Sequence, residues 1–243
     1  MAERARKPEP DSNSGTPPLS DLRQHGYARI WPQLANQLIV LGWSEQDMVE
    51  TGAAFRLSLT LFGSLYRANG APFVTHTIGT ASILAIHGAP KSLVQGALLH
   101  AAYTHGKLAT PLRATLNAEH RKLVSRQVGS GVEEIARNYR RHPPSLVPVP
   151  EKADAYEEDV AAVILVRAAN HLEEMLDFGL SYVRKVQKRA AAVLGHARLL
   201  LPALGYDRLL AEIEAAERLS DESNIVPAAL QSIARGKPEQ PSD

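Results

Sequence analysis

The spacing of apolar side chains constrains the fold more than any other feature, because they recur every three or four residues through most of the chain. Trp31, Leu34, Leu38 and Leu41, for example, form one stripe along a helix with 3.6 residues per turn. No stretch shows the sustained alternation of polar and apolar residues, or the run of β-branched residues, that a sheet would need. The sequence therefore predicts an all-α protein.

Turn and cap residues divide the chain into separate helices. Gly42 ends the first helix, and Ser44 is the expected N-cap of the second, with acidic residues in its first turn. A helical hairpin is expected around His87–Pro90, since glycine ends one helix and proline opens the next. Gly129–Gly131 interrupt a less regular segment, and the prolines of Pro143–Pro150 predict an extended connector. The expected helices are 27–41, 44–66, 73–86, 91–103, 154–176, 181–204 and 206–219.

The length and composition predict one domain between two disordered tails. A chain of 243 residues with 44% hydrophobic content can bury one sizeable core without disulfides or structural metal. Residues 1–20 and 235–243 are rich in proline, serine, charged residues and glycine, and they have too little apolar surface to offset the entropy of ordering. We expect residues 21–234 to form a single domain.

Composition also excludes several functions. The chain has no cysteine, which excludes thiolate catalysis and cysteine-based metal sites. The N-terminal segment has no apolar stretch typical of a signal peptide or membrane anchor, so we expect a cytoplasmic protein without a membrane partner. A formal charge of +1 provides no global field to attract nucleic acid, and no nucleic-acid partner is expected.

Two segments carry a resemblance to a known family. Residues 65–100 contain Arg67 before a Gly-x-Pro turn, His76 at the start of the next helix, and His100 about one helical hairpin later. This pattern resembles the opening of the HD hydrolase domain of the RelA/SpoT family, and residues 163–176 resemble that family's helix with an Ala-Asp-Arg motif. The resemblance covers about residues 44–176 and implies an HD-like helical bundle. Residues 177–234 are then expected to form a C-terminal helical extension of that bundle.

The chain departs from the family where the family binds its metal. Ala101 follows His100 in place of the aspartate of the His-Asp pair, and Asn170 replaces a second aspartate. Thr104 and His105 align with the family's Glu-Asp pair, so the acid/base carboxylates are missing as well. The residues are also similar to an HD-like group with His-small-x-Tyr in place of His-Asp, a likeness that implies a fold and no activity.

The same residues stand out without the family. Arg167, Asn170, His171 and Glu174 are spaced three and four residues apart, so they are expected to share one face of an otherwise apolar helix. His100 lies in the apolar run ALLHAAY, where an unpaired imidazole would be costly. These residues therefore need polar partners, a ligand or a metal.

Three interpretations of these residues stay open. The first is a hydrogen-bonded core network of His76, His100 and Asn170. In the second, a divalent metal (Mn, Fe or Zn) is held by His76, His100, His105 and His171. The third is a pocket that binds a ligand without any cofactor, for which the candidate residues are Arg67, His76, His100, Tyr103, Thr104, Arg167, Asn170 and Glu174.

Two basic runs, residues 137–142 and 182–189, could hold phosphates, but the balanced total charge favours solvated helix faces. Our preferred hypothesis is a degenerate HD-type domain that lacks metal-dependent hydrolase activity and binds a small ligand, which could be phosphorylated, or a protein partner. The alternative is a metal-dependent phosphohydrolase for a nucleotide or phosphorylated metabolite, with a histidine-rich metal site. A third possibility is an interaction module that uses its C-terminal helices. The sequence does not define the oligomeric state.

Overall fold

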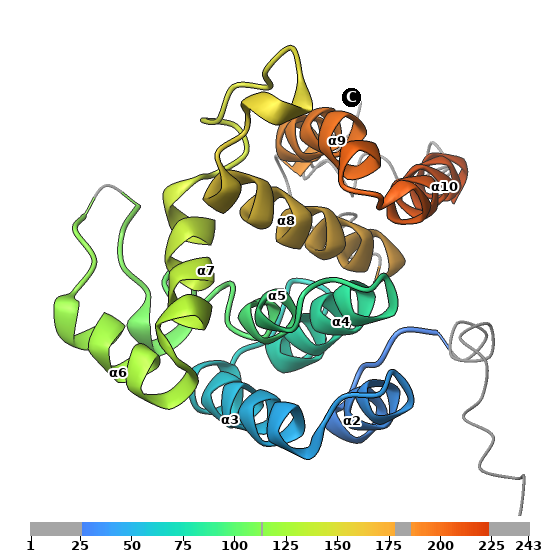
Figure 1. The fold of residues 1–243 in the computed structure, drawn as a ribbon. Coiled ribbons are helices and arrows are strands. Elements are labelled where there is room, and N and C mark those ends of the chain that lie inside the picture. Colours follow the sequence, from blue (N-terminus) through green and yellow to red (C-terminus); the bar gives the residue numbers. More distant parts are fainter. Residues whose placement is uncertain (1–25, 113, 178–185, 224–243) are drawn as a thin grey trace, which may run out of the picture.

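The computed structural model describes residues 26–112, 114–177 and 186–223, which form a bundle of helices (Figure 1). This part of the chain contains nine α-helices, two short 3-10 helices and no β-strand; one isolated β-bridge joins Tyr66 to Pro72. The predicted all-α class is confirmed. The predicted tails at 1–20 and 235–243 lie outside the described residues.

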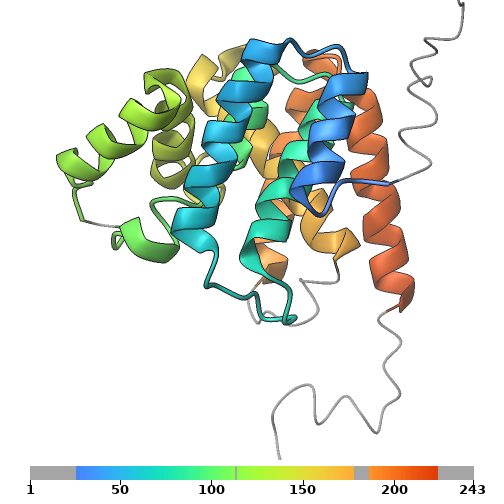
Figure 2. The same cartoon turned by 90° about the horizontal axis from the view of Figure 1, so that it is seen from below.

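The first two helices form one side of the bundle. Helix α2 spans Trp31–Val40 and α3 spans Glu45–Phe62. The predicted cap at Ser44 is confirmed: its hydroxyl accepts a hydrogen bond from the Asp47 amide at 3.2 Å, and the Asp47 carboxylate accepts one from the Ser44 amide at 2.9 Å. Viewed from below, α2, α3 and α4 lie side by side (Figure 2).

Helices α4 (Phe73–Ile86) and α5 (Lys91–Ala97) form the predicted hairpin. Nearly every residue of α4 is buried, because α2, α3, α5 and α8 all pack against it. The prediction that α5 extends to Tyr103 was wrong. Beyond Ala97 the backbone forms turns with i to i+3 hydrogen bonds, such as the 3.0 Å bond from the Thr104 amide to the Ala101 carbonyl.

Helices α6 (Ala118–Val128) and α7 (Ser130–Arg141) form a second pair. Gly129 separates them with a φ of +85°, a conformation that favours glycine, so the predicted interruption is confirmed. Helix α5 packs closely on α7: a Cβ added at Gly96 would lie 2.6 Å from Cγ2 of Ile135.

The long helix α8 (Glu158–Leu176) begins later than predicted, after a 3-10 turn at Ala153–Ala155. It packs against α4 on one side and against α9 (Val186–Ala203) and α10 (Asp207–Ser223) on the other (Figure 1). Buried residues of α9 and α10 join the same hydrophobic cluster as those of α4 and α8. The prediction of one domain over residues 21–234 reaches beyond the described residues and stays a prediction.

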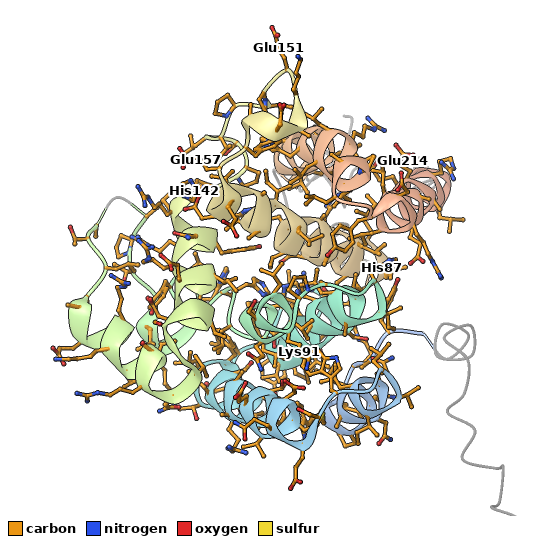
Figure 3. All side chains as sticks on the ribbon, viewed as in Figure 1. His87, Lys91, His142, Glu151, Glu157 and Glu214 are labelled. Atoms are coloured by element: carbon orange, nitrogen blue, oxygen red, sulfur yellow. The ribbon has the colours of Figure 1, made fainter. Side chains whose placement is uncertain are left out.

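Polar contacts also connect the helices. His87, at the end of α4, lies close to α10 (Figure 3), where its Nε2 is 3.5 Å from a carboxylate oxygen of Glu212. Lys91, at the start of α5, pairs with Asp47 at the start of α3.

Among the helices of the described part of the chain, none combines the length and apolar character needed to span a bilayer.

Candidate functional site

A cavity of about 980 Å³ lies among the α3–α4 connection, α4, the turns after α5, the end of α7 and helix α8. Both segments that carry the family resemblance contribute to it. It brings together eight of the residues predicted for the site: Arg67, His76, His100, Thr104, His105, Arg167, Asn170 and Glu174.

Two predicted residues do not line this cavity. Tyr103 is fully buried, and its hydroxyl donates to Glu133 of α7 at 2.9 Å. His171 faces α10, with its Nε2 3.5 Å from a carboxylate oxygen of Glu217. Successive residues of an α-helix are about 100° apart, so His171 lies well away from the direction of Asn170. The polar face of α8 that borders the cavity therefore consists of Arg167, Asn170 and Glu174, without the predicted His171.

Arg67 is held by a tight loop between α3 and α4. Its backbone amide donates to the Ala71 carbonyl at 2.9 Å, and Gly70 permits the turn with a φ of +84°. The loop is tied to the end of α8 by Asn69, whose amide nitrogen donates to the Asp177 carboxylate at 2.7 Å. This anchoring points the Arg67 guanidinium toward α8 and the cavity.

His76 and Glu173 form a buried pair behind the cavity. Glu173 accepts hydrogen bonds from Arg67 at 2.8 Å and from Arg29 at 2.7 Å, and it contacts Nδ1 of His76. Burial raises the pKa of Glu173 to about 7, although both guanidinium groups oppose that change. Burial, assisted by the charge of Arg67, lowers the pKa of His76 to about 3. Burial thus favours the neutral form of each group.

His100 faces the cavity with a defined tautomer. Its Nδ1 lies 2.6 Å from the Ala97 carbonyl, which can only accept, so Nδ1 carries the proton. Nε2 is then the acceptor. Burial, together with the nearby His76, lowers the pKa of His100 well below its usual value. The two imidazole rings meet edge to face with centroids 5.2 Å apart.

Tyr139 of α7 is a central cavity residue that the sequence analysis missed. Its hydroxyl donates to Oδ1 of Asn170 at 3.1 Å, and its ring lies 4.8 Å from that of His100. The Arg167 guanidinium stacks 3.8 Å from the Tyr139 ring centroid and donates to the Tyr139 carbonyl. Tyr139 therefore orients both Arg167 and Asn170.

Thr104, His105 and Glu174 complete the lining. Thr104 and His105 are exposed, and their Oγ1 and Nδ1 atoms lie 3.0 Å apart. The His105 ring packs 5.1 Å from that of Phe73. Glu174 is buried, and its carboxylate lies 3.4 Å from an Nη atom of Arg67.

These residues do not fit a divalent metal. No group of three or more His, Asp or Glu side chains in the described part of the chain is arranged to hold one. His76 is engaged by Arg67, Glu173 and Asn170, and Asn170 also accepts from Tyr139. Ala101 lines the cavity without any ligand atom. A metal needs several anionic or imidazole ligands that converge, and such a set is not preformed here.

The basic run at 137–142 was predicted to be a solvated helix face, and this was wrong for one of its arginines. Arg140 is buried rather than solvated, and it donates to the carbonyls of Thr110, Pro111 and Ala114. It thereby holds the segment that forms one wall of the cavity. The other basic run, at 182–189, concerns side chains outside the described residues.

Comparison with known families gives a match over part of the chain. The family described as a domain of unknown function, DUF6817, matches residues 62–142, about a third of the chain. This segment includes Arg67, His76, His100 and Tyr139. A search of curated protein sequences found no match.

Among solved structures, the chain is similar to a metazoan ortholog of SpoT, which is described as hydrolysing ppGpp and playing a role in starvation responses. The superposition has a TM-score of 0.48 with 15% sequence identity, and it covers 73% of this chain and 97% of that chain. At this identity the likeness concerns the fold and says nothing about the reaction.

Proposed function

We propose that this protein binds a small anionic ligand, such as a phosphorylated metabolite, in the cavity between α4, α7 and α8, without a metal ion. The observation that supports this proposal is the charge of the lining. Arg67, Arg140 and Arg167 line the cavity, whereas Glu174 is the one carboxylate among the described lining residues. A cavity of about 980 Å³ is within the range of small-molecule sites.

The preset orientation of the arginines also favours an anion. Arg167 is fixed by stacking on Tyr139, and Arg67 by its pairs with Glu173 and Glu174. Guanidinium groups in fixed positions bind phosphate through paired hydrogen bonds with little loss of side-chain entropy. His100 adds a neutral Nε2 acceptor, which suits a ligand hydroxyl or a protonated phosphate oxygen.

The loss of hydrolase activity is part of the proposal. Where the RelA/SpoT-like pattern would have two aspartates, this chain has Ala101 and an asparagine engaged by Tyr139. A metal-activated water would therefore lack the anionic ligands that hold and polarise the ion.

Elemental analysis of the purified, untagged protein tests this view first, after dialysis against Mn(II), Fe(II) and Zn(II). We expect no stoichiometric metal. Metal bound at one equivalent and lost in a His76→Ala, His100→Ala variant would contradict the proposal. It would favour the alternative, a metal-dependent phosphohydrolase with a histidine-rich site, and phosphate release from nucleotides would then be assayed.

Ligand binding is tested by thermal shift and calorimetry with a panel of nucleoside phosphates and sugar phosphates in the presence of EDTA. For a panel member that binds, Arg167→Gln should weaken affinity roughly tenfold or more, the usual effect of losing a charged hydrogen bond. Arg198→Gln is the matched control, because Arg198 lies on the surface of α9. If Arg167→Gln unfolds, Thr104→Val tests the same cavity at an exposed position. Equal affinity in all variants would rule out this cavity.

Restoring the two carboxylates gives a complementary test. The variant Ala101→Asp, Asn170→Asp should gain affinity for Mn(II), because it adds two anionic ligands beside His76 and His100. Isothermal titration with Mn(II) measures the gain. No gain over the wild type would contradict the expectation that two added carboxylates complete a metal site here, and it would mean that the cavity itself has been remodelled.

A further inference from the structure

A second cavity, of about 670 Å³, adjoins the first at the C-terminal end of α7, the end marked by His142 in Figure 3. Its walls are α6, α7 and the two segments that flank them. Four arginines line it, Arg121, Arg137, Arg140 and Arg141, and no carboxylate is among its described lining residues. Only Arg140 among these arginines also lines the first cavity.

Three of these guanidinium groups are held in place by the protein. Arg121 makes a two-pronged contact with Glu133 at 2.9 and 3.0 Å, and Arg137 pairs with Glu134. Arg140 is fixed by backbone carbonyl groups. Two carboxylates thus compensate four cations, which leaves the cavity with a positive surplus.

Arg137 and Arg141 differ in how far their charge is available to a ligand. Nε of Arg137 is buried and has no hydrogen-bond partner in the described structure. Arg141 is exposed and has no ion pair with any described residue. Arg141 therefore offers its charge to a ligand directly, whereas Arg137 does so through its terminal nitrogens, because its Nε has no surface that a ligand could reach.

The remaining lining is largely apolar. Leu112 and Leu146 are 55% and 71% exposed, and Leu116 and Pro143 also line the cavity. Exposed leucines beside clustered arginines suit a ligand that has both an apolar surface and anionic groups. The volume matches a nucleotide-sized molecule better than an extended acidic peptide, which would need a longer groove.

We propose that this second cavity binds a small polyanion that carries an aromatic or apolar group, such as a nucleoside diphosphate. The anionic groups contact Arg137 and Arg141, and the leucines cover the apolar part. The two cavities share Leu112, Arg140 and Pro143, but the anion contacts proposed here differ from those of the first site, because neither Arg137 nor Arg141 lines the first cavity.

Isothermal titration of the full chain with ADP and with inorganic pyrophosphate tests the proposal. The variant Arg137→Gln, Arg141→Gln should bind ADP roughly tenfold more weakly or worse, because two charge-assisted contacts are lost. The matched control is Lys122→Gln, Arg126→Gln, which removes two exposed cations from α6 outside the cavity. This control should bind like the wild type.

The outcomes separate this site from the first. If the Arg137→Gln, Arg141→Gln variant loses one class of ADP sites and keeps the class that Arg167→Gln weakens, the result supports two sites. Equal ADP binding in the wild type and this variant overturns the proposal, as does wild-type protein that binds neither probe. Binding of polyglutamate, with no binding of ADP or pyrophosphate, would also overturn the proposal and would favour an acidic peptide as the ligand. Arg141→Gln alone, at an exposed position, keeps the test valid if the double variant does not fold.

Discussion

Replacing Glu173 with glutamine should change how the stability of the protein depends on pH. Glu173 is 1% exposed, and burial raises its pKa from 4.5 to about 7 even though Arg29 and Arg67 contact it. Because the folded state holds this proton more tightly than the unfolded state, the proton contributes stability. That contribution is complete below about pH 4.5 and is lost as the pH rises to about 7.

The size of the effect follows from the same interval. At about 1.4 kcal/mol per pKa unit, a change from 4.5 to about 7 corresponds to about 3 kcal/mol of unfolding free energy. Glutamine resembles the protonated acid, since its amide can donate to Nδ1 of His76 while its oxygen accepts from an arginine. The unfolding free energy of the variant minus that of the wild type should therefore rise by about 3 kcal/mol across this window.

Urea unfolding followed by far-UV circular dichroism, repeated at several pH values between about 4.5 and 8, measures this difference. His76, whose pKa is lowered from 6.5 to about 3, stabilises the fold fully above about pH 6.5 and loses that contribution as the pH falls toward 3. Because His76 is present in both proteins, this loss is common to both and cancels in the difference. Glu134→Gln, an exposed change on α7, is the control and should shift stability by only about 0.5 kcal/mol at any pH. A constant difference between Glu173→Gln and wild type would refute the reasoning, because it would mean that the two arginines keep Glu173 ionised throughout.

Three further changes test the packing around the site. Tyr103→Phe should lower the unfolding free energy by about 1 kcal/mol in urea unfolding, because it removes the buried hydrogen bond to Glu133; an unchanged midpoint would contradict this. Gly96→Ala should cost about 1–3 kcal/mol through contact with Ile135, and a double-mutant cycle with Ile135→Ala should recover part of that cost; strictly additive effects would argue against the contact. Gly106→Ala should destabilise more than Gly129→Ala in thermal unfolding, because both have positive φ but only Gly106 faces a backbone oxygen at 2.5 Å; equal melting temperatures would disprove it.

The sequence predicted the helical class and most turns because both depend on local chemistry. Glycine and proline set the break at Gly88 and the interruption at Gly129, and Ser44 caps its helix. The end of α5 could not be predicted in this way. Residues 98–103 are good helix formers, but tertiary packing bends the backbone into turns there, and this bend directs His100 into the cavity.

Most of the candidate cavity was predictable from residue spacing together with the family resemblance. Tyr139 was missed because an aromatic residue within a basic run reads as part of a solvated surface. Its actual role depends on α7 lying across α8, a contact between segments that are distant in the sequence. The different roles of the adjacent residues Glu173 and Glu174 could not be predicted from the sequence either. Glu173 faces α4, whereas Glu174 faces the cavity.

Two helical glycines explain why these distant segments come together so closely. A Cβ at Gly79 would lie 2.8 Å from Cγ of Glu173, and one at Gly96 would lie 2.6 Å from Ile135. The first glycine brings α4 against α8, and the second brings α5 against α7. Because α4, α7, α8 and the turns after α5 all line the cavity, these two contacts hold the helices that form its walls close together. Glycine without positive φ inside a helix costs stability, so its presence at both contacts indicates that close approach outweighs that cost.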